Sequence, residues 1–390
     1  MASARSALLS LAVGAFAIGT TEFTPMGLLP VIAQDLHVSV PRAGGLVSAY
    51  AFGVMIGAPF MTLLLGAISR KAALIGLMML YIVGNLGAGL SHSYAILMFW
   101  RVVTSLSHGA FFGLGAVEAS SVVAPERRAS AVASMFLGLT IANIFGVPAA
   151  TWLGDNAGWR SAFLVTALLG ALAVLALSIA LPPRGRSARP DILGELRVLV
   201  RGDVLLALAV TTLGAGIMFV LYTYIAPFLH SITGAGDALV TLALMTIGVG
   251  FSIGAALGGR LADRSTGFAL KIMLPVLGAV MLVYPFLAAS SFGAIAGILL
   301  WSAASFAIMP ALQMRTMQAA RQAPALASSV NIGAFNLGNA LGAWLGGGVL
   351  SAGLGYAAVS MSGTALAALA LLIVIFAGGG GEKPEEQGVG

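Results

Sequence analysis

Long apolar segments constrain this chain more than any other feature of its sequence. Twelve runs of about 20 apolar residues follow one another, and each is long enough to cross the hydrocarbon core of a bilayer as a helix. Only 8% of the residues are charged, against about 25% in soluble domains. The sequence therefore predicts an all-α membrane protein with twelve transmembrane helices. The expected spans are residues 8–30, 44–66, 72–91, 95–117, 129–153, 160–181, 204–229, 238–259, 268–289, 292–314, 326–349 and 355–377.

The chain is predicted to contain two similar six-helix halves. Its one long polar connection, residues 182–203, lies near the middle of the sequence. Trp152 and Trp344, each followed by Leu-Gly, are 192 residues apart, and the loop residues Arg70 and Arg264 are 194 apart. A duplicated six-helix unit is a transporter architecture in which substrate binds between the halves near the membrane midplane. The expected units are an N-terminal bundle (1–181), a cytoplasmic linker (182–203), a C-terminal bundle (204–377) and a short cytoplasmic tail (378–390).

Basic residues are distributed very unequally between the two ends of the predicted spans. Sixteen of the 19 Lys and Arg residues lie at one set of ends, Arg42 and Arg160 lie at the other, and Arg101 lies inside a span. The positive-inside rule makes the richer side cytoplasmic and places both termini there. The net charge of +6 then reflects topology, because a nucleic-acid site would need basic residues concentrated on one exposed face.

Glu22 is a charged residue about two-thirds of the way across the first span, in the segment TTEFT. An ionisable group at the centre of a span costs about 2.5–3.5 kcal/mol on insertion scales, so it requires a function or a partner. Burial favours the neutral form of a carboxylic acid, and a site that changes charge is what proton coupling needs. We expect Glu22 to couple transport to protons. The alternative is a structural carboxylate, paired permanently with Arg101 or capped by the neighbouring threonines.

Arg101 and His108 lie seven residues apart in the fourth span, which returns them to nearly the same helix face, about 10 Å apart along the axis. Arg101 keeps its charge and can stabilise the ionised form of a nearby acid, or it can pair structurally with backbone carbonyls. Histidine titrates near neutral pH, so His108 is a candidate proton relay; the alternative is a hydrogen-bonded packing residue. Glu118, near the end of the same span, is expected to be a solvated interfacial charge.

Polar uncharged and aromatic side chains mark a candidate substrate surface. Asn331, Phe335 and Asn339 recur at every fourth position of the eleventh span, which puts them on one face. Amides, hydroxyls and aromatic faces suit a polar uncharged ligand such as a sugar, or an amphiphile. The alternative is hydrogen bonding between helices, worth about 0.6 kcal/mol per pair on average. The candidate substrate-binding residues are Thr21, Thr140, Asn143, Tyr222, Tyr224, Asn331, Phe335, Asn336 and Asn339.

Signatures of other activities are missing from the sequence. There is no phosphate-binding loop of the form G-x-x-x-x-G-K-[ST], no hydrolase elbow and no cluster with metal-ligand spacing. The chain has no cysteine, which excludes disulfides and thiolate metal sites. We therefore expect no enzyme activity, no metal and no cofactor, with protons as the coupling ion. The expected partners are a small-molecule substrate and the lipid bilayer, no nucleic acid is expected, and the expected state is a monomer.

Several motifs resemble those of the major facilitator superfamily. The segment GRLADR at 259–264 is similar to its loop motif G-x-L-a-D-R, Arg101 with Gly109 resembles the motif of its proton-coupled exporters, and Gly138 with GVP at 146–148 resembles their antiporter motif. Longer segments resemble the arabinose and sugar efflux permeases of the drug:proton antiporter branch, and the resemblance covers essentially the whole chain. These segments are TEFTPMGLLP at 21–30, RVV at 101–103, SHGAFFG at 107–113 and FNLG at 335–338.

The resemblance implies a bacterial inner-membrane exporter that exchanges protons for a sugar, a drug or a related metabolite. It implies proton or substrate roles for Glu22 and His108, and assistance of proton release by Arg101. Two departures from the motifs stand out. Ser69 occupies the position of the loop aspartate in the first half, which puts in doubt a normal latch there, and Val147 separates the Gly-Pro pair of the antiporter motif, which weakens the case for antiport. The residues of the implied latch for the inward-closed state are Arg70, Gly259, Asp263 and Arg264.

Three functions are therefore considered. The first is a proton-coupled efflux antiporter that works by alternating access of the two halves around a midplane site. The second is a proton symporter that imports a sugar or a nucleoside, since either direction can use the same acid. The third is a membrane receptor without transport activity, which would need a sizeable soluble domain or a long charged tail. The tail at 378–390 is short, which disfavours the third.

Overall fold

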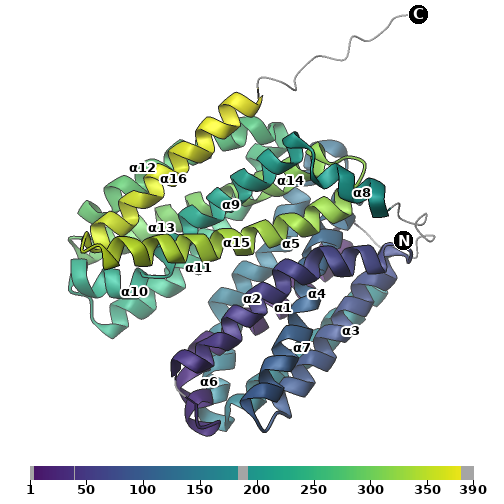
Figure 1. Cartoon of the computed structure of the whole chain (residues 1–390), viewed down its shortest axis with the longest axis horizontal. Coiled ribbons are helices and arrows are strands. Elements are labelled where there is room, and N and C mark those ends of the chain that lie inside the picture. The colour runs from purple at the N-terminus through teal and green to yellow at the C-terminus, as the bar shows by residue number, and fades with distance from the viewer. Residues whose placement is uncertain (1–3, 39, 183–191, 379–390) are drawn as a thin grey trace, which may run out of the picture.

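The computed structural model describes residues 4–38, 40–182 and 192–378, and these residues form helices and no β-strand. The helices make two bundles, one from each half of the chain (Figure 1). The first bundle contains α1 (Ala4–Asp35), α2 (Val40–Leu65), α3 (Arg70–Gly89), α4 (Tyr94–Ser121), η1 (Pro125–Arg127), α5 (Arg128–Ile141), η2 (Ala142–Gly146), α6 (Val147–Ala157) and α7 (Trp159–Ala180). The second contains α9 (Gly202–Tyr222), α10 (Ile225–Phe228), η3 (Leu229–Thr233), α11 (Asp237–Arg264), α12 (Thr266–Leu287), α13 (Ser291–Ala307), α14 (Met309–Ala319), α15 (Pro324–Ser351) and α16 (Gly355–Gly378).

Within the described residues, eleven helical segments are long and apolar enough to cross a membrane, and they match eleven of the twelve predicted spans. The remaining predicted span, 326–349, is α15. Its asparagines and serines make it more polar than the others, but its 28 residues extend about 42 Å, more than the hydrocarbon thickness of about 30 Å. The prediction of an all-α membrane fold with two six-helix bundles is confirmed.

The connection between the bundles is only partly described. A short helix, α8 (Ile192–Leu199), lies inside the predicted linker 182–203. Residues 183–191 of that linker, and the predicted tail from residue 379 onward, lie outside the described residues. The domain boundaries at these segments therefore stay predictions.

The fifth span is interrupted where the sequence predicts a continuous helix. It consists of α5, the π-helical turn η2 and α6, and the N–H of Val147 donates to the carbonyl of Ala142, five residues earlier. A π-helical turn contains one residue more than an α-helical turn. The turn lies directly ahead of Val147 and Pro148, the first two residues of α6, where proline is tolerated because the first N–H groups of a helix have no partner within it.

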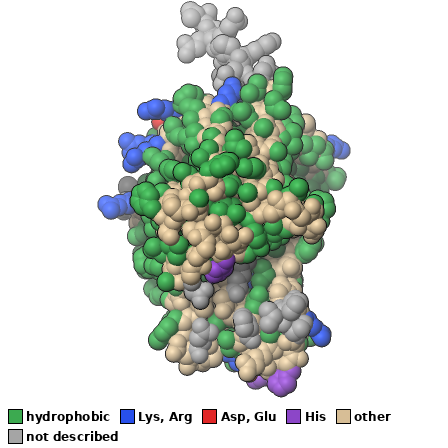
Figure 2. All heavy atoms as spheres, turned by 90° about the vertical axis from the view of Figure 1, so that its left-hand side faces the viewer, with side chains coloured by type: hydrophobic (Ala, Val, Ile, Leu, Met, Phe, Trp, Pro, Cys, Tyr) green, Lys and Arg blue, Asp and Glu red, His purple; other side chains and the backbone are tan. Residues whose placement is uncertain are grey.

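Apolar side chains cover much of the outer surface of both bundles. Figure 2 shows them spread over the face of the second bundle. Large examples that are exposed include Phe60, Trp152, Phe292 and Phe376. In water such a surface would be unfavourable, whereas lipid tails accept it, and the helices satisfy their own backbone hydrogen bonds.

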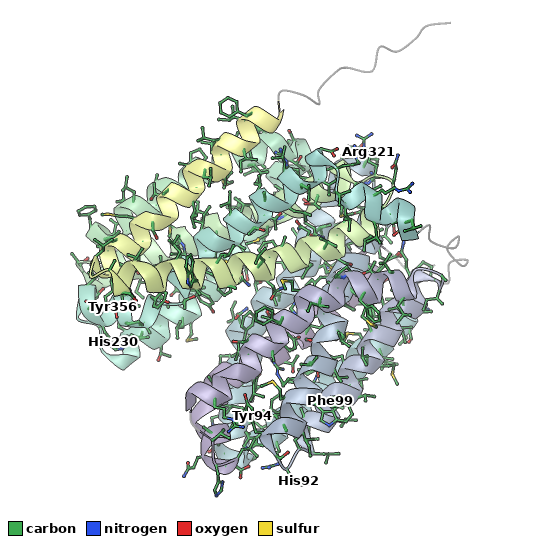
Figure 3. All side chains as sticks on the ribbon, in the orientation of Figure 1. His92, Tyr94, Phe99, His230, Arg321 and Tyr356 are labelled. Carbon is green, nitrogen blue, oxygen red and sulfur yellow. The ribbon has the colours of Figure 1, made fainter. Side chains whose placement is uncertain are left out.

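The two ends of the molecule differ in charge and in how closely the bundles approach. We call the end that holds Arg70, Arg128, Arg264 and Arg321 the basic face. Figure 3 shows Arg321 at this end, where the bundles converge. At the opposite end the bundles diverge: His92 and Tyr94 lie on the first bundle, and His230 and Tyr356 on the second (Figure 3).

Contacts between the halves extend from the basic face toward the middle of the helices. α15 packs against α2 and α4, where Gly113 is so close that a Cβ atom on it would lie 1.9 Å from Ser329 Oγ. Thr62 Oγ1 donates to the same Ser329 Oγ at 2.6 Å. On the other side α11 packs against α5 and η2, and Ile144 lies directly over Gly248. The basic face is therefore closed by direct helix contacts between the bundles.

Candidate functional site

A cavity lies between the two bundles. Helices from both halves contribute to its lining, so a rocking motion of the halves would change the side from which the cavity is accessible. Its walls are mostly aromatic and aliphatic, with one carboxylate, one imidazole and three carboxamides. The lining residues are Glu22, Phe23, His108, Phe112, Phe136, Leu139, Asn143, Met218, Phe219, Tyr222, Phe251, Phe306, Met309, Ile332, Phe335, Asn336 and Asn339.

Glu22 and His108 face each other on the wall formed by the first half. Glu22 Oε2 lies 3.9 Å from His108 Nδ1, and their side chains are 15% and 6% exposed. Tyr50 OH lies 3.3 Å from the same His108 Nδ1. The imidazole also packs against the rings of Tyr50 and Phe112. An acid and an imidazole in contact, at the edge of a cavity, can hold a proton in alternative positions.

Arg101 lies behind this pair and is fully buried. Its Nη1 donates to the carbonyl of Thr21, next to Glu22 in the chain, at 2.9 Å. Its guanidinium carbon lies 4.2 Å from the ring centroid of Tyr50, in a cation–π contact. Its Nε and Nη2 atoms have no hydrogen-bond partner among the residues that the structure describes. A buried cation with unused donors favours negative charge nearby, and Glu22 is the acid of the adjacent cavity wall.

The permanent Glu22–Arg101 ion pair considered from the sequence is not what the structure shows. The polar contact of the Glu22 carboxyl is to His108, and Arg101 binds a backbone carbonyl. Thr21, the threonine next to Glu22, donates instead to Asn85 Oδ1 at 2.5 Å. Glu22 is therefore less tightly held than a structural carboxylate would be.

Aromatic rings form the wall contributed by the second half. Phe251 stacks on Phe306 with centroids 4.3 Å apart, and Tyr222 packs edge-on against Phe219 and Phe251. Across the cavity, Phe112 and Phe136 of the first half stack at 5.3 Å. Such rings provide large, rigid apolar contact area.

Three carboxamides supply most of the uncharged polarity of the cavity. Asn143 and Asn336 each donate to a carbonyl one turn earlier in their own helix. Asn339 Oδ1 is buried and, within the described part of the chain, has no hydrogen-bond partner, so it can accept a hydrogen bond from a ligand. The π-helical turn η2 contains Asn143, and such turns occur frequently at functional sites.

The structure places the predicted substrate-binding residues in two groups. Five of them line the cavity: Asn143, Tyr222, Phe335, Asn336 and Asn339. The other four lie outside its lining and make hydrogen bonds within the protein. Thr21 binds Asn85, Thr140 binds Ser252 at 2.8 Å, Tyr224 donates to the carbonyl of Ala343, and Asn331 binds Thr211, Thr316 and Gln313.

The predicted latch residues lie at the basic face. Asp263 Oδ1 accepts hydrogen bonds from the backbone N–H groups of Ala129 (2.8 Å) and Ser130 (3.2 Å), and Asp263 also binds the Ser130 hydroxyl. The carboxylate thus caps the N-terminus of α5, in the other half. Gly259 lets the helices approach, since a Cβ atom there would lie 2.8 Å from that of Ala133. Arg264 follows Asp263 at the end of α11.

Arg70, the latch residue of the first half, contacts the carboxylate of Glu118 at 3.6 Å. The side chain of Glu118 is only 3% exposed, so the expectation of a solvated interfacial charge was wrong. The start of α3 lies over the end of α4 and brings a guanidinium to this carboxylate. Burial of a paired charge is far less costly than burial of an isolated one.

Most of the apolar lining could not be identified from the sequence. Phe219, Phe251 and Met309 look like any other apolar residue of a membrane span. Phe112 lies in a segment that was singled out only for its resemblance to a family. A periodicity argument does not help, because helices in lipid are apolar on all faces.

Comparison with known proteins finds relatives that match most of the chain. The family model described as Major Facilitator Superfamily matches residues 11–343. The inner membrane transport protein YdhP of Escherichia coli K12 is 59% identical over 94% of both chains. A chloramphenicol resistance protein of Streptomyces lividans is 31% identical over 93% of this chain and 94% of its own.

The fold is also similar to solved structures. A crystal structure of the transporter FucP, in the outward conformation, matches with a TM-score of 0.77, covering 96% of this chain and 98% of that chain at 16% identity. At that identity the likeness concerns the fold alone. The family model and the relative YdhP, in contrast, match by sequence, over residues 11–343 and over 94% of the chain respectively. This polytopic membrane protein is a transporter, not an enzyme, and it belongs to the major facilitator superfamily.

Proposed function

We propose that the protein is a proton-coupled antiporter that exports a small solute across the bacterial inner membrane. One observation carries this proposal: Glu22 lines the cavity between the halves and contacts His108 at 3.9 Å, with Arg101 buried behind it. An ionisable group in a membrane span marks a substrate or ion pathway by default. A proton and a substrate that use the same cavity wall compete, and competition of this kind couples their movements in opposite directions.

The mechanism we propose is alternating access. By the positive-inside rule the basic face is cytoplasmic, which also places both termini in the cytoplasm. The contacts at Gly113–Ser329 and Asp263–α5 close that face in this structure. Protonation of Glu22 from the outside would neutralise the wall and permit the halves to rock. Loss of the proton to the cytoplasm would then accompany entry of the next substrate molecule.

Arg101 would assist the release step. It cannot lose its own proton under these conditions, and its unused Nε and Nη2 donors favour an ionised carboxylate nearby. A small movement of Glu22 toward Arg101 would therefore release the proton, and a movement toward His108 and Tyr50 would retain it. This gives the two states of the site different proton affinities.

The walls suggest a substrate that combines an apolar or aromatic body with a few polar groups. Rings on both sides would sandwich the body, and Asn143, Asn336 and Asn339 would bind hydroxyl or amide groups. The relative named as a chloramphenicol resistance protein supports export and a solute of this type. Because a single chain provides the whole cavity, we propose that a monomer is the functional unit, without metal or cofactor.

Flux through proteoliposomes tests the proposal. A panel of arabinose, chloramphenicol and a lipophilic cation is assayed with and without an imposed pH gradient, using wild type, Glu22→Gln and the control Glu126→Gln on exposed η1. We expect proton-driven exchange for wild type and the control, and its loss in Glu22→Gln. Full activity of Glu22→Gln would remove Glu22 from the mechanism. Movement of solute and protons in the same direction would instead identify a symporter.

A further inference from the structure

The latch formed by Asp263 has no acidic equivalent in the other half. Asp263 ends α11 and caps α5 across the halves. The internal repeat, with offsets of 192–194 residues, relates Asp263 to Ser69 and the start of α5 to the start of α15 at Pro324. Ser69 Oγ accepts from the N–H of Ala72 and so caps its own helix, α3. No side chain of the described residues caps the first turn of α15.

A crevice occupies the place where the missing carboxylate would act. Its lining joins the two halves: Arg70 and Arg128 come from the first, and Arg321 and Pro324 from the second. The other lining residues include Gln318 and Met314 of α14. Arg321 is labelled in Figure 3, at the basic face.

Positive charge is in excess in this crevice. Arg70 is paired with Glu118. Arg128 and Arg321 are exposed and have no ion pair with any of the described residues. Asp263 lies close to Arg128 in space, but its carboxylate oxygens accept hydrogen bonds from the N-terminus of α5. Guanidinium groups from both halves therefore line one crevice, and the repulsion between their charges by itself opposes closure.

We propose that this crevice binds a phosphate-type anion, which supplies the negative charge that Ser69 lacks and holds the basic face closed. Arginine guanidinium groups present planar, forked donors that match the oxygens of phosphate. The uncapped positive end of the 28-residue α15, at Pro324, adds to the attraction. The anion would bridge Arg321 of the second half to Arg70 and Arg128 of the first, as Asp263 bridges the halves on the other side.

Binding is tested on the purified full chain in detergent. Inorganic phosphate is titrated at constant ionic strength against chloride, and the unfolding temperature is recorded. We expect a saturable rise for wild type and about tenfold weaker binding for Arg321→Gln, the factor that one charge-assisted hydrogen bond is typically worth. Arg260→Gln, which removes an exposed arginine outside the crevice, should bind like wild type. Equal responses of wild type and Arg321→Gln would overturn the proposal.

A second variant introduces the missing carboxylate as a side chain of the protein itself. Ser69→Asp keeps the cap on α3, because aspartate is at least as good an N-cap as serine. The chain has no cysteine, so Ala67→Cys and Gly202→Cys introduce unique spin-label sites at the basic ends of α2 and α9. We expect phosphate to favour the short label distance in wild type, and Ser69→Asp to show that distance without phosphate. A label distance that ignores both phosphate and Ser69→Asp would contradict the proposal.

The source of the phosphate group is a separate arm of the test. The distance between the two spin labels is measured in nanodiscs of phosphatidylcholine alone and in nanodiscs that also contain phosphatidylglycerol, both without added phosphate. Closure by phosphatidylglycerol identifies a lipid headgroup as the ligand, and closure by inorganic phosphate alone identifies the free anion. Closure by neither overturns the proposal. None of these readouts measures transport, so their outcome is independent of the proposed export function.

Discussion

The two walls of the cavity handle different chemistry. The first half contributes the ionisable groups Glu22 and His108, supported by Arg101. The second half contributes stacked rings and two carboxamides, and none of its described cavity-lining residues is ionisable in the neutral pH range. The ionisable side chains thus belong to one bundle and most aromatic side chains to the other. In the proposed mechanism a substrate contacts both walls, so its binding depends on the protonation of one wall while the other wall holds it.

The largest expected effect comes from moving the acid across the cavity. Glu22→Gln should reduce proton-driven flux roughly 100-fold or more, in the range typical for loss of a proton-transfer group. Adding Asn339→Asp to Glu22→Gln places a carboxylate on the aromatic wall, where no histidine or arginine supports it. We expect the double variant to stay inactive in proteoliposome flux with an imposed pH gradient. Restored coupling would show that an acid on either wall of the cavity suffices, and it would contradict the difference in function between the two walls.

The aromatic wall should govern affinity without affecting coupling. Tyr222→Ala removes a ring that packs against Phe219 and Phe251, so the apparent affinity for the transported solute should fall about tenfold. Tyr222→Phe, which retains the ring, is the matched control and should change affinity little. The dependence of flux on pH should be the same in all three proteins. A shifted pH profile in Tyr222→Ala would show that the walls are not separate in function.

His108 should affect the pH profile more than the affinity. Its Nδ1 contacts both Glu22 and Tyr50, and His108→Gln replaces an imidazole that can change charge with an amide that cannot. We expect the pH at half-maximal flux to move and the maximal rate to change only a few-fold, on the order of what a relay beside the principal acid contributes. The profile is measured by varying the external pH at a fixed gradient. An unchanged profile would favour the packing alternative.

Sequence reasoning recovered the ionisable wall far better than the aromatic one. Glu22 and His108 stand out because charge in a span is costly and rare. Phe219 and Phe251 do not stand out, since apolar residues face lipid, neighbouring helices and cavities alike. The same limit explains why Asn331 and Asn336, on adjoining stripes of one helix, differ: Asn331 binds Thr211, Thr316 and Gln313, while Asn336 lines the cavity. Only the packing of α9, α14 and α15 decides between those positions.

The helices, too, have features that could be predicted from the sequence and features that could not. The lengths and order of the apolar runs predicted the two bundles, because hydrophobic thickness fixes how long a span must be. The π-helical turn at Ala142–Gly146 was not predicted, although it directly precedes Val147, the residue that separates the Gly-Pro pair. Whether an insertion makes a π-turn, a kink or a shift in register depends on contacts such as Ile144 on Gly248. These contacts involve the other half and cannot be read from local sequence.

The smallest expected effect concerns Asp263, the latch that joins the two halves at the basic face. Asp263→Asn retains oxygen acceptors for Ala129 and Ser130 but removes the charge beside the positive end of α5. It should cost only about 0.3–1 kcal/mol, whereas Asp263→Ala also loses the cap and should cost about 0.5–2 kcal/mol. Each loss should appear as a larger population of the long distance between labels at Ala67→Cys and Gly202→Cys. Because Asp263 touches neither cavity wall, both variants should shift that population without changing the pH at half-maximal flux. A pH shift in Asp263→Ala would mean that closure of the basic face alters the proton site itself, and the two walls would then act as one unit.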